Sequence, residues 1–154
     1  MFGSTYTNYV LVLRVSQTVA NGSMVMRMRT VSTLESGTNY NFGWVGSYVG
    51  AGPTYNYTGF SITNPFSPDT SFYTGISAGI GYSGQSRLEI MSPNQARETR
   101  ILGQGYSNYS GTYYNVAIHG TGEVTTNTVY TGFRLYPSAG TSSGEYQLYG
   151  YRIA

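Results

Sequence analysis

Few residues of this sequence could carry out acid–base, nucleophilic or metal chemistry. The chain of 154 residues has one histidine, His119, six acidic residues, and neither cysteine nor lysine. A single histidine without a cysteine neither completes a thiolate zinc site nor activates a thiol nucleophile. We therefore interpret His119, which precedes Gly120-Thr121-Gly122, as a strand-end or interface residue.

The acidic residues form no recognisable catalytic pair. Glycoside hydrolysis needs two carboxyl groups about 5 to 9.5 Å apart across a sugar, and nothing in the spacing of the acids selects two of them. They are Glu35, Asp69, Glu89, Glu98, Glu123 and Glu145. We expect them to be solvated, paired with arginine or placed at subunit contacts. The sequence thus predicts a protein that is not an enzyme and has no metal site and no cofactor.

A glycine-rich segment, Gly79–Gly84, matches the spacing G-x-G-x-x-G of dinucleotide-binding turns. In such sites a helix follows the glycines, and an acidic residue lies about 20 positions further on. Here Gln85–Ile90 has the alternation of a strand, and no acid lies at that distance. We interpret the segment as a loop.

Charge is scarce in this chain. Charged side chains make up 9% of the residues, against about 25% in ordinary soluble domains. The net charge of +2 comes from arginines that are spread along the sequence, so no basic stripe for nucleic acid is expected. No apolar run of 18 residues indicates a membrane span.

The elements that must position these residues are strands. Leu11, Leu13 and Val15 alternate with polar and smaller residues, and Met24, Met26 and Met28 do the same after the turn signal at Asn21-Gly22. Similar segments bounded by turn residues recur along the chain. We expect strands at Tyr9–Val15, Met24–Val31, Tyr40–Val49, Tyr55–Ile62, Phe72–Ile76, Arg87–Ile90, Thr99–Gly105, Thr112–His119, Thr128–Tyr136 and Glu145–Ile153.

These strands, with no long helix between them, predict an all-β protein, an antiparallel β-sandwich of jelly-roll type. Residues 1–154 are expected to form a single domain, with an N-terminal arm at 1–8 and a long loop region at 63–86. The one helical candidate is the turn at Ser92–Glu98, where Pro93 occupies a helix-start position.

The arginines and tyrosines are expected to form protein contacts, because both residue types are enriched at interfaces. Alternation places a set of them outside the sandwich, and we predict an oligomer or partner interface there. The set is Arg27, Arg29, Tyr130, Arg134, Tyr136, Tyr149 and Tyr151. An alternative is glycan stacking on aromatic rings. The rings for that alternative are Trp44, Tyr40, Tyr48, Tyr55 and Tyr57.

The C-terminal third carries a sequence pattern that resembles a known family. The segments that carry it are Val116–Gly122 (VAIHGTG), Tyr130–Tyr136 (YTGFRLY), Ser138–Gly140 (SAG) and Ser143–Gly150 (SGEYQLYG). They resemble the closing strands of the jelly-roll-like structural domain found in virion proteins of tailed bacteriophages. Tyr9–Val15 and the methionine segment match the early hairpin of that domain.

This resemblance implies a virion protein without catalysis, located on the outer surface of the particle. Its expected partners are the major capsid protein or other virion proteins, and the resemblance implies a homotrimer. Strand-forming sequence begins by Tyr9, after Met1, with no long shaft before it. This favours a capsid decoration (cement) protein. The alternative is a receptor- or glycan-binding domain of a tail fibre, or a carbohydrate-binding module.

Overall fold

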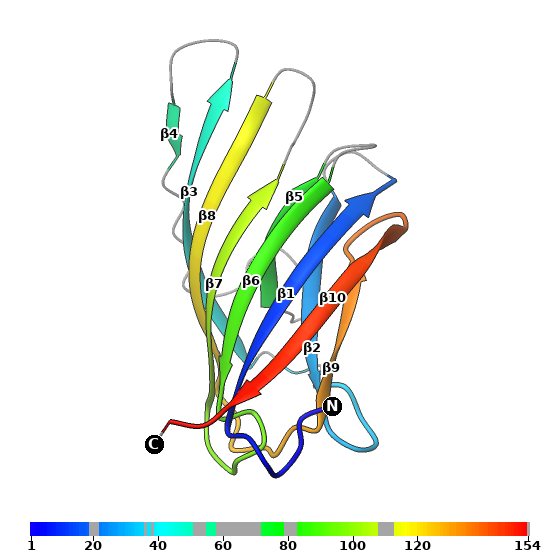
Figure 1. The fold of residues 1–154 in the computed structure, drawn as a ribbon, viewed down its shortest axis with the longest axis vertical. Helices are drawn as coiled ribbons and strands as arrows, with labels where there is room; N and C mark the ends of the chain where they lie inside the picture. Colours follow the sequence, from blue (N-terminus) through cyan, green and yellow to red (C-terminus); the bar gives the residue numbers. More distant parts are fainter. Residues whose placement is uncertain are drawn as a thin grey trace.

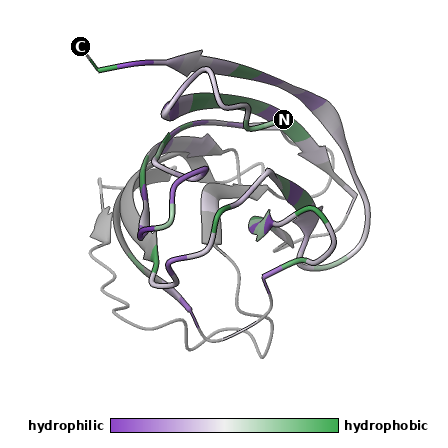
Figure 2. Cartoon of the chain, turned by 90° about the horizontal axis from the view of Figure 1, so that it is seen from below, coloured by the Kyte–Doolittle hydropathy of each residue, from purple (hydrophilic) through white to green (hydrophobic). Residues whose placement is uncertain are grey.

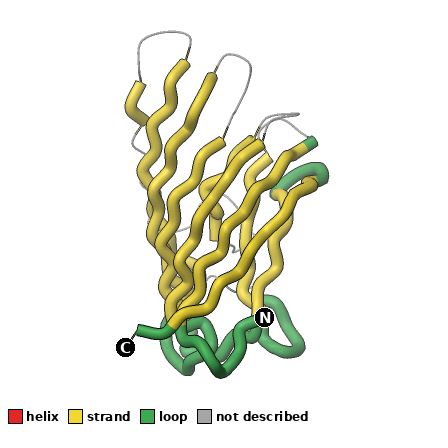
Figure 3. Tube along the Cα trace, viewed as in Figure 1, coloured by secondary structure: helices red, strands yellow, loops and turns green. Residues whose placement is uncertain are grey.

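The chain folds into β-strands and loops. In this computed structural model, residues 1–18, 22–35, 37, 39–50, 55–57, 72–78, 83–107 and 113–153 are described. Within them there are ten strands and no helix (Figure 3). None of these segments is a helix that is long and apolar enough to cross a membrane. The all-β, antiparallel architecture predicted from the sequence is confirmed.

The strands form two antiparallel sheets. The strands are β1 (Asn8–Gln17), β2 (Gly22–Arg29), β3 (Tyr40–Gly50), β4 (Tyr55–Tyr57), β5 (Phe72–Ala78), β6 (Ser83–Met91), β7 (Thr99–Ser107), β8 (Tyr113–Val124), β9 (Gly132–Pro137) and β10 (Ser142–Tyr151). The large sheet has seven strands in the order β10-β1-β6-β7-β8-β3-β4, and the small sheet has three in the order β5-β2-β9. The large sheet is curved, and the small sheet lies behind it in Figure 1.

Side chains from facing strands fill the space between the sheets. The large sheet contributes Leu11 and Leu13 of β1, which are buried together with Ile90 of β6 and Ile101 of β7. The small sheet contributes the alternate methionines of β2, which are almost fully buried as predicted: Met24, Met26 and Met28. Each such apolar side chain contributes about 1.5 to 3 kcal/mol when it is removed from water.

Three strand pairs are nested within one another along the chain. The first strand pairs with the last (β1–β10), the second with the ninth (β2–β9) and the third with the eighth (β3–β8). The outermost and innermost of these pairs lie in the large sheet, and the middle pair lies in the small sheet. The chain therefore follows the path of one long antiparallel ribbon that passes from one sheet to the other.

The N-terminal segment closes the lower end of the sandwich, where both termini lie (Figures 1 and 2). The Phe2 ring is buried, with its centroid 4.7 Å from that of Tyr9. The backbone N–H of Phe2 donates to the carbonyl of Thr131 at 2.9 Å. The Asn94 side chain donates to the carbonyl of Gly3 at 2.6 Å. Residues 1–7 are thus held against two loops.

The turn at Ser92–Glu98, which we expected to be helical, contains bends and turns only. Ser92 has a φ of 59°, which lies outside the right-handed helical region. Its N–H is bonded to Thr7 and Asn8 of the N-terminal segment, at 2.9 Å to the carbonyl of Thr7. These contacts fix a turn and exclude a helix start.

Several strand boundaries also differ from the prediction. β9 begins at Gly132, four residues later than expected, whereas β8 continues through His119 to Val124. β5 confirms the short strand expected near Phe72, and β6 begins at Ser83, inside the expected loop region 63–86. The remaining residues of that loop region, 63–71 and 79–82, lie outside the described part of the chain.

Candidate functional site

Four predicted interface residues lie on the outer face of the small sheet. In the β2–β9 register, Arg27 lies directly opposite Arg134, and Val25 lies opposite Tyr136. These four positions alternate with the core positions Met26, Met28, Phe133 and Leu135, so they share the face that points away from the large sheet. Arg29 is the next residue of this face on β2. We call Arg27, Arg29, Arg134 and Tyr136 the arginine–tyrosine cluster.

The Tyr136 ring lies near two guanidinium groups. The Cζ atoms of Arg27 and Arg134 are 5.5 and 5.6 Å from the centroid of its ring. Both distances are within the range of cation–π attraction, which contributes about 0.5 to 1 kcal/mol at an exposed site. The Tyr136 hydroxyl is buried and has no hydrogen-bond partner. The cluster therefore contains a polar atom that the protein itself does not satisfy.

The cluster concentrates positive charge. Two arginines directly opposite one another in an antiparallel pair repel each other. Arg29 and Arg134 are exposed. Where both partners are described, the one ion pair is Arg100–Glu98, at 3.9 Å, at a different place in the fold. The exposed guanidinium groups of Arg29 and Arg134 can form charge-assisted hydrogen bonds with a carboxylate or another anion.

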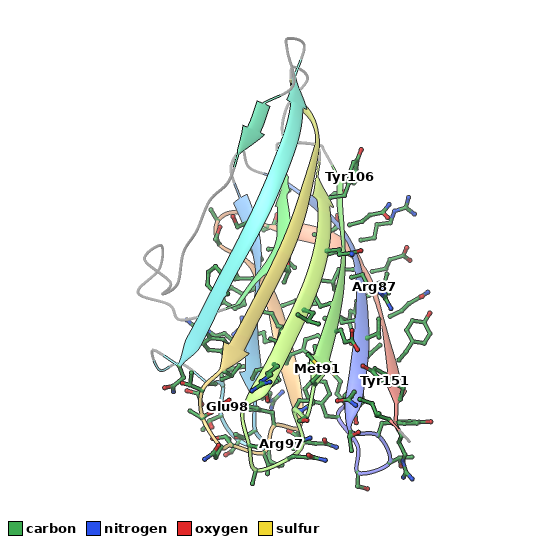
Figure 4. All side chains as sticks on the ribbon, turned by 90° about the vertical axis from the view of Figure 1, so that its left-hand side faces the viewer. Arg87, Met91, Arg97, Glu98, Tyr106 and Tyr151 are labelled. Atoms are coloured by element: carbon green, nitrogen blue, oxygen red, sulfur yellow. The ribbon has the colours of Figure 1, made fainter. Side chains whose placement is uncertain are left out.

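The outer face of the large sheet forms a second exposed surface. Its apolar members come from three adjacent or nearby strands and are between 38 and 54% exposed: Val12, Leu102, Tyr106 and Tyr149. Figure 4 shows Arg87, Tyr106 and Tyr151 projecting from this sheet. The Tyr151 hydroxyl donates to the Glu89 carboxylate, and burial followed by this hydrogen bond raises the pKa of Tyr151 to about 12. We did not predict from the sequence that Leu102 and Tyr106 lie on this surface. Their alternation with Ile101, which is buried, would have indicated it.

One edge of the large sheet is formed by β10, which pairs with β1 on one side and with no described strand on the other. Its side chains are exposed on both faces: Tyr149 points to the outer face, and Tyr146, on the core-facing side, is 50% exposed. β10 contains no lysine and no proline, the residues that usually protect such an edge. Tyr149 and Tyr151 thus belong to a surface separate from the arginine–tyrosine cluster.

Tyr130 was predicted on the outside of the sandwich, and this was wrong. Its side chain is fully buried, and its hydroxyl donates to Glu35 Oε2 at 3.1 Å and contacts Thr126 Oγ1 at 2.5 Å. Burial raises the pKa of the Tyr130 hydroxyl, the hydrogen bond with Thr126 opposes this rise, and the nearby Glu35 carboxylate adds to it. Tyr130 therefore links its own loop to the loop that carries Glu35, and its side chain offers no surface to a partner.

Tyr40 was predicted as a stacking surface in the glycan alternative, and this was also wrong. The side chain is 2% exposed, so its ring has no face open to a sugar. Its hydroxyl accepts the N–H of Met28 at 2.8 Å and donates to the carbonyl of Glu35 at 3.3 Å. Burial raises the pKa of Tyr40 well above its usual value.

The other residues of the glycan alternative lie on strands at the far end of the large sheet. Trp44 and Tyr48 belong to β3, and Tyr55 and Tyr57 to β4. Their side chains, and that of His119 on β8, lie outside the described part of the structure. Stacking on these rings stays a prediction.

The described residues include no group of three or more histidine, cysteine or acidic side chains that could hold a metal ion. Glu35 also accepts hydrogen bonds from Asn39 Nδ2 at 2.9 Å and from the N–H of Gly37 at 3.2 Å. Together with Tyr130, these donors occupy both oxygens of the carboxylate. The hydrogen bonds of Glu35 therefore indicate a structural role.

Comparison of the chain with protein families, with curated proteins and with solved structures finds no match.

Proposed function

We propose that the protein is a structural component of a bacteriophage particle, a decoration protein that binds the outside of the capsid shell and stabilises it without catalysis. The observation that carries this proposal is the arginine–tyrosine cluster, which gathers Arg27, Arg134 and Tyr136 on one sheet face. Such residues dominate protein–protein contacts. The C-terminal sequence pattern, from Val116 to Gly150, supplies the link to virion proteins.

We further propose that the two sheets form a jelly roll. The nested pairs β1–β10, β2–β9 and β3–β8 support this topology, because a jelly roll is a long antiparallel ribbon wrapped across two layers. The additional pairing of β1 with β6 extends the large sheet beyond the simplest version of that plan. The proposed domain is single and includes all ten described strands.

The proposed partner is the major capsid protein, and the proposed assembly is a homotrimer at a threefold position of the shell. A closed threefold ring uses a heterologous contact, in which two different surfaces of the same chain meet. The chain has surfaces that could serve, since the free edge at β10 and the arginine–tyrosine cluster lie on different strands. One would join the copies, and the other would face the shell.

The proposal is tested by locating the protein in purified particles and by removing it. We expect labelled antibody to decorate the capsid surface, and particles without the protein to release their genome at a lower temperature. The free protein should have three times the 16.8 kDa mass of one chain. Label confined to the tail tip, with capsids of unchanged heat stability, would instead support the receptor-binding alternative.

A further inference from the structure

We infer that β10 pairs with β10 of a second copy of this chain, antiparallel and across a twofold axis, so that two seven-stranded sheets join edge to edge. The inference does not rest on the proposed function. It goes beyond the proposed threefold ring, because a twofold contact brings the same strand of both copies together. On a shell, such a contact would join one ring to the next.

β10 is the longest free sheet edge among the described strands. It has ten residues, whereas the other edge strands, β4, β5 and β9, have three, seven and six. It pairs with β1 over its whole length without a bulge, and Figure 1 shows it as the outermost strand of the large sheet. Such an edge presents a row of N–H and C=O groups with which a further strand can pair. β10 does not block this pairing, since it contains neither lysine nor proline.

The charges at the two ends of β10 are complementary to those of a second copy. Glu145 is the one charged residue of β10 and lies near its start, and Arg152 follows its last residue. Both are exposed, and neither forms an ion pair with a described residue, although Arg14 lies opposite Glu145 on β1. Arg152 Nε donates to the carbonyl of Thr5. In an antiparallel pair of identical strands, each Glu145 lies near Arg152 of the other copy, whereas a parallel pair would bring like charges together.

Leu148 is the residue that lies opposite its own copy when these charges meet. A twofold axis perpendicular to the sheet passes beside Leu148 in this register, and residues 144–152 of the two strands are paired. Arg152 then lies opposite Gly144, next to Glu145. The two Glu145 carboxylates lie about 20 Å apart along the strands, well beyond the screening length of about 8 Å at 0.15 M salt. Their repulsion therefore does not oppose the pairing.

The core-facing side of β10 offers aromatic and aliphatic surface to the second copy. Tyr146 is 50% exposed, and its ring centroid is 6.0 Å from that of Phe133. The axis places Tyr146 opposite Gly150 of the other copy, which is covered by the Tyr6 ring, itself 42% exposed. The half-buried Leu148 meets its own copy at the axis. Pairing therefore removes apolar surface from water on the side where the core lies.

The test is cross-linking of single-cysteine variants, which is possible because the chain has no cysteine. Gln147→Cys places a thiol at an exposed position beside the axis, and its own copy lies diagonally opposite, about 7 to 8 Å away. A short bismaleimide linker should therefore join two such chains. Gln104→Cys is the matched control, since Gln104 is exposed on the same row of the sheet but lies on β7, beyond β1 and β6. It should give only the low yield of random collisions.

Charge reversal tests the predicted proximity of the strand ends. Two edge strands form a small contact, so association should be weak, and the series of protein concentrations extends to about 1 mM. In the Gln147→Cys protein at an ionic strength of about 0.05 M, Arg152→Glu should raise the concentration for half-maximal cross-linking about tenfold, because two attractions become repulsions. Adding Glu145→Arg should restore most of the loss. Arg100→Glu, an equal charge change at an exposed position on β7, should have no effect.

Folding of all variants is checked by their urea unfolding curves, which should match that of the unaltered protein because the changed side chains are exposed. The inference is overturned if Gln147→Cys cross-links no better than Gln104→Cys, or if the double charge reversal associates as weakly as Arg152→Glu alone. It is also overturned if the β10 amides gain protection from hydrogen exchange only on purified shells, because a strand of the shell protein would then cover this edge.

This inference and the proposed function fail in different ways. If Gln147→Cys cross-links as described but the protein does not attach to purified shells, the twofold contact stands and the decoration role falls. If the protein attaches to shells while Gln147→Cys cross-links no better than the control, the decoration role stands and the inference falls.

Discussion

Tyr130 and Tyr136 lie six residues apart and use their hydroxyl groups in opposite ways. The Tyr130 hydroxyl donates to Glu35 and contacts Thr126 in a fully buried position. The Tyr136 hydroxyl is buried without a partner. Replacing each by phenylalanine removes one oxygen atom and little else, so the two variants form a matched pair.

We predict that Tyr130→Phe lowers the free energy of unfolding by about 1 to 3 kcal/mol, because Glu35 loses a donor in a half-buried site. Urea unfolding at neutral pH measures the change. An unfolding midpoint equal to that of the unaltered protein would show that the Glu35–Tyr130 hydrogen bond does not hold the loops.

Tyr136→Phe should have the opposite effect on stability. Removing a buried hydroxyl that has no partner is expected to raise the free energy of unfolding by about 1 kcal/mol, while the ring keeps its contacts with both arginines. The same urea titration measures it. Destabilisation of the size seen for Tyr130→Phe would mean that this hydroxyl is bonded in the folded protein.

The sequence predicted the residues of regular strands well and those just outside them badly. Met24, Met26 and Met28 were placed in the core correctly because alternation holds without interruption in β2. Tyr130 was placed outside by extending the alternation of β9 backwards from Phe133. β9 begins only at Gly132, so Tyr130 lies in a loop where alternation has no meaning.

Pairing between distant strands could not be predicted at all. Arg27 and Arg134 were each expected on an outer face, but no local pattern indicates that β2 and β9 are neighbours or that these two residues are directly opposed. Register between strands far apart in sequence depends on the packing of the whole core. The sequence therefore predicted the individual residues of the candidate site, and only the structure showed that they lie together.

At the scale of elements, the pairing of β1 and β10 depends on a close approach at Gly144. A Cβ atom at this position would lie 2.1 Å from the carbonyl oxygen of Arg14 and 2.9 Å from the Cα of Val15, both backbone atoms that cannot turn away. A Cβ atom added at Gly150, in the same strand, would lie 2.3 Å from Cδ2 of the Tyr6 ring, but that ring belongs to a side chain that can move.

We predict that Gly144→Ala lowers the free energy of unfolding by about 1 to 3 kcal/mol, because the ends of β1 and β10 must separate. Gly3→Ala is the matched control, since nothing lies within 4 Å of its added Cβ, and should change stability by less than about 0.5 kcal/mol. Thermal unfolding of both variants makes the comparison. Equal midpoints would show that the strand ends adjust freely.

At the scale of the whole molecule, stability should fall at alkaline pH. The chain has no lysine, so its tyrosines are the main groups that titrate between pH 9 and 11. Burial raises the pKa of Tyr40 and Tyr130 above the usual value near 10, and the pKa of Tyr151 is raised to about 12. The unfolded chain therefore loses protons first as the pH rises.

The contribution of these tyrosines to the free energy of unfolding should consequently be constant below about pH 9 and decrease as the pH passes 10, because deprotonation favours the unfolded state. Urea midpoints at pH 9 and pH 11 measure the decrease, and return to pH 9 should restore the first value. Tyr40→Phe should have a smaller decrease between the two pH values. Identical midpoints at both pH values in the unaltered protein would contradict the burial of these hydroxyls.

The pairing of the first strand with the last also has a consequence for biosynthesis. β1 lies between β6 and β10, so this strand is made well before either of its two partners. Until β10 emerges, one edge of β1 remains exposed, with Val10 and Val12 beside it. Such an unpaired edge on a nascent chain is prone to aggregate. Slowing translation shortly before Ser142 should therefore increase the insoluble fraction of the protein.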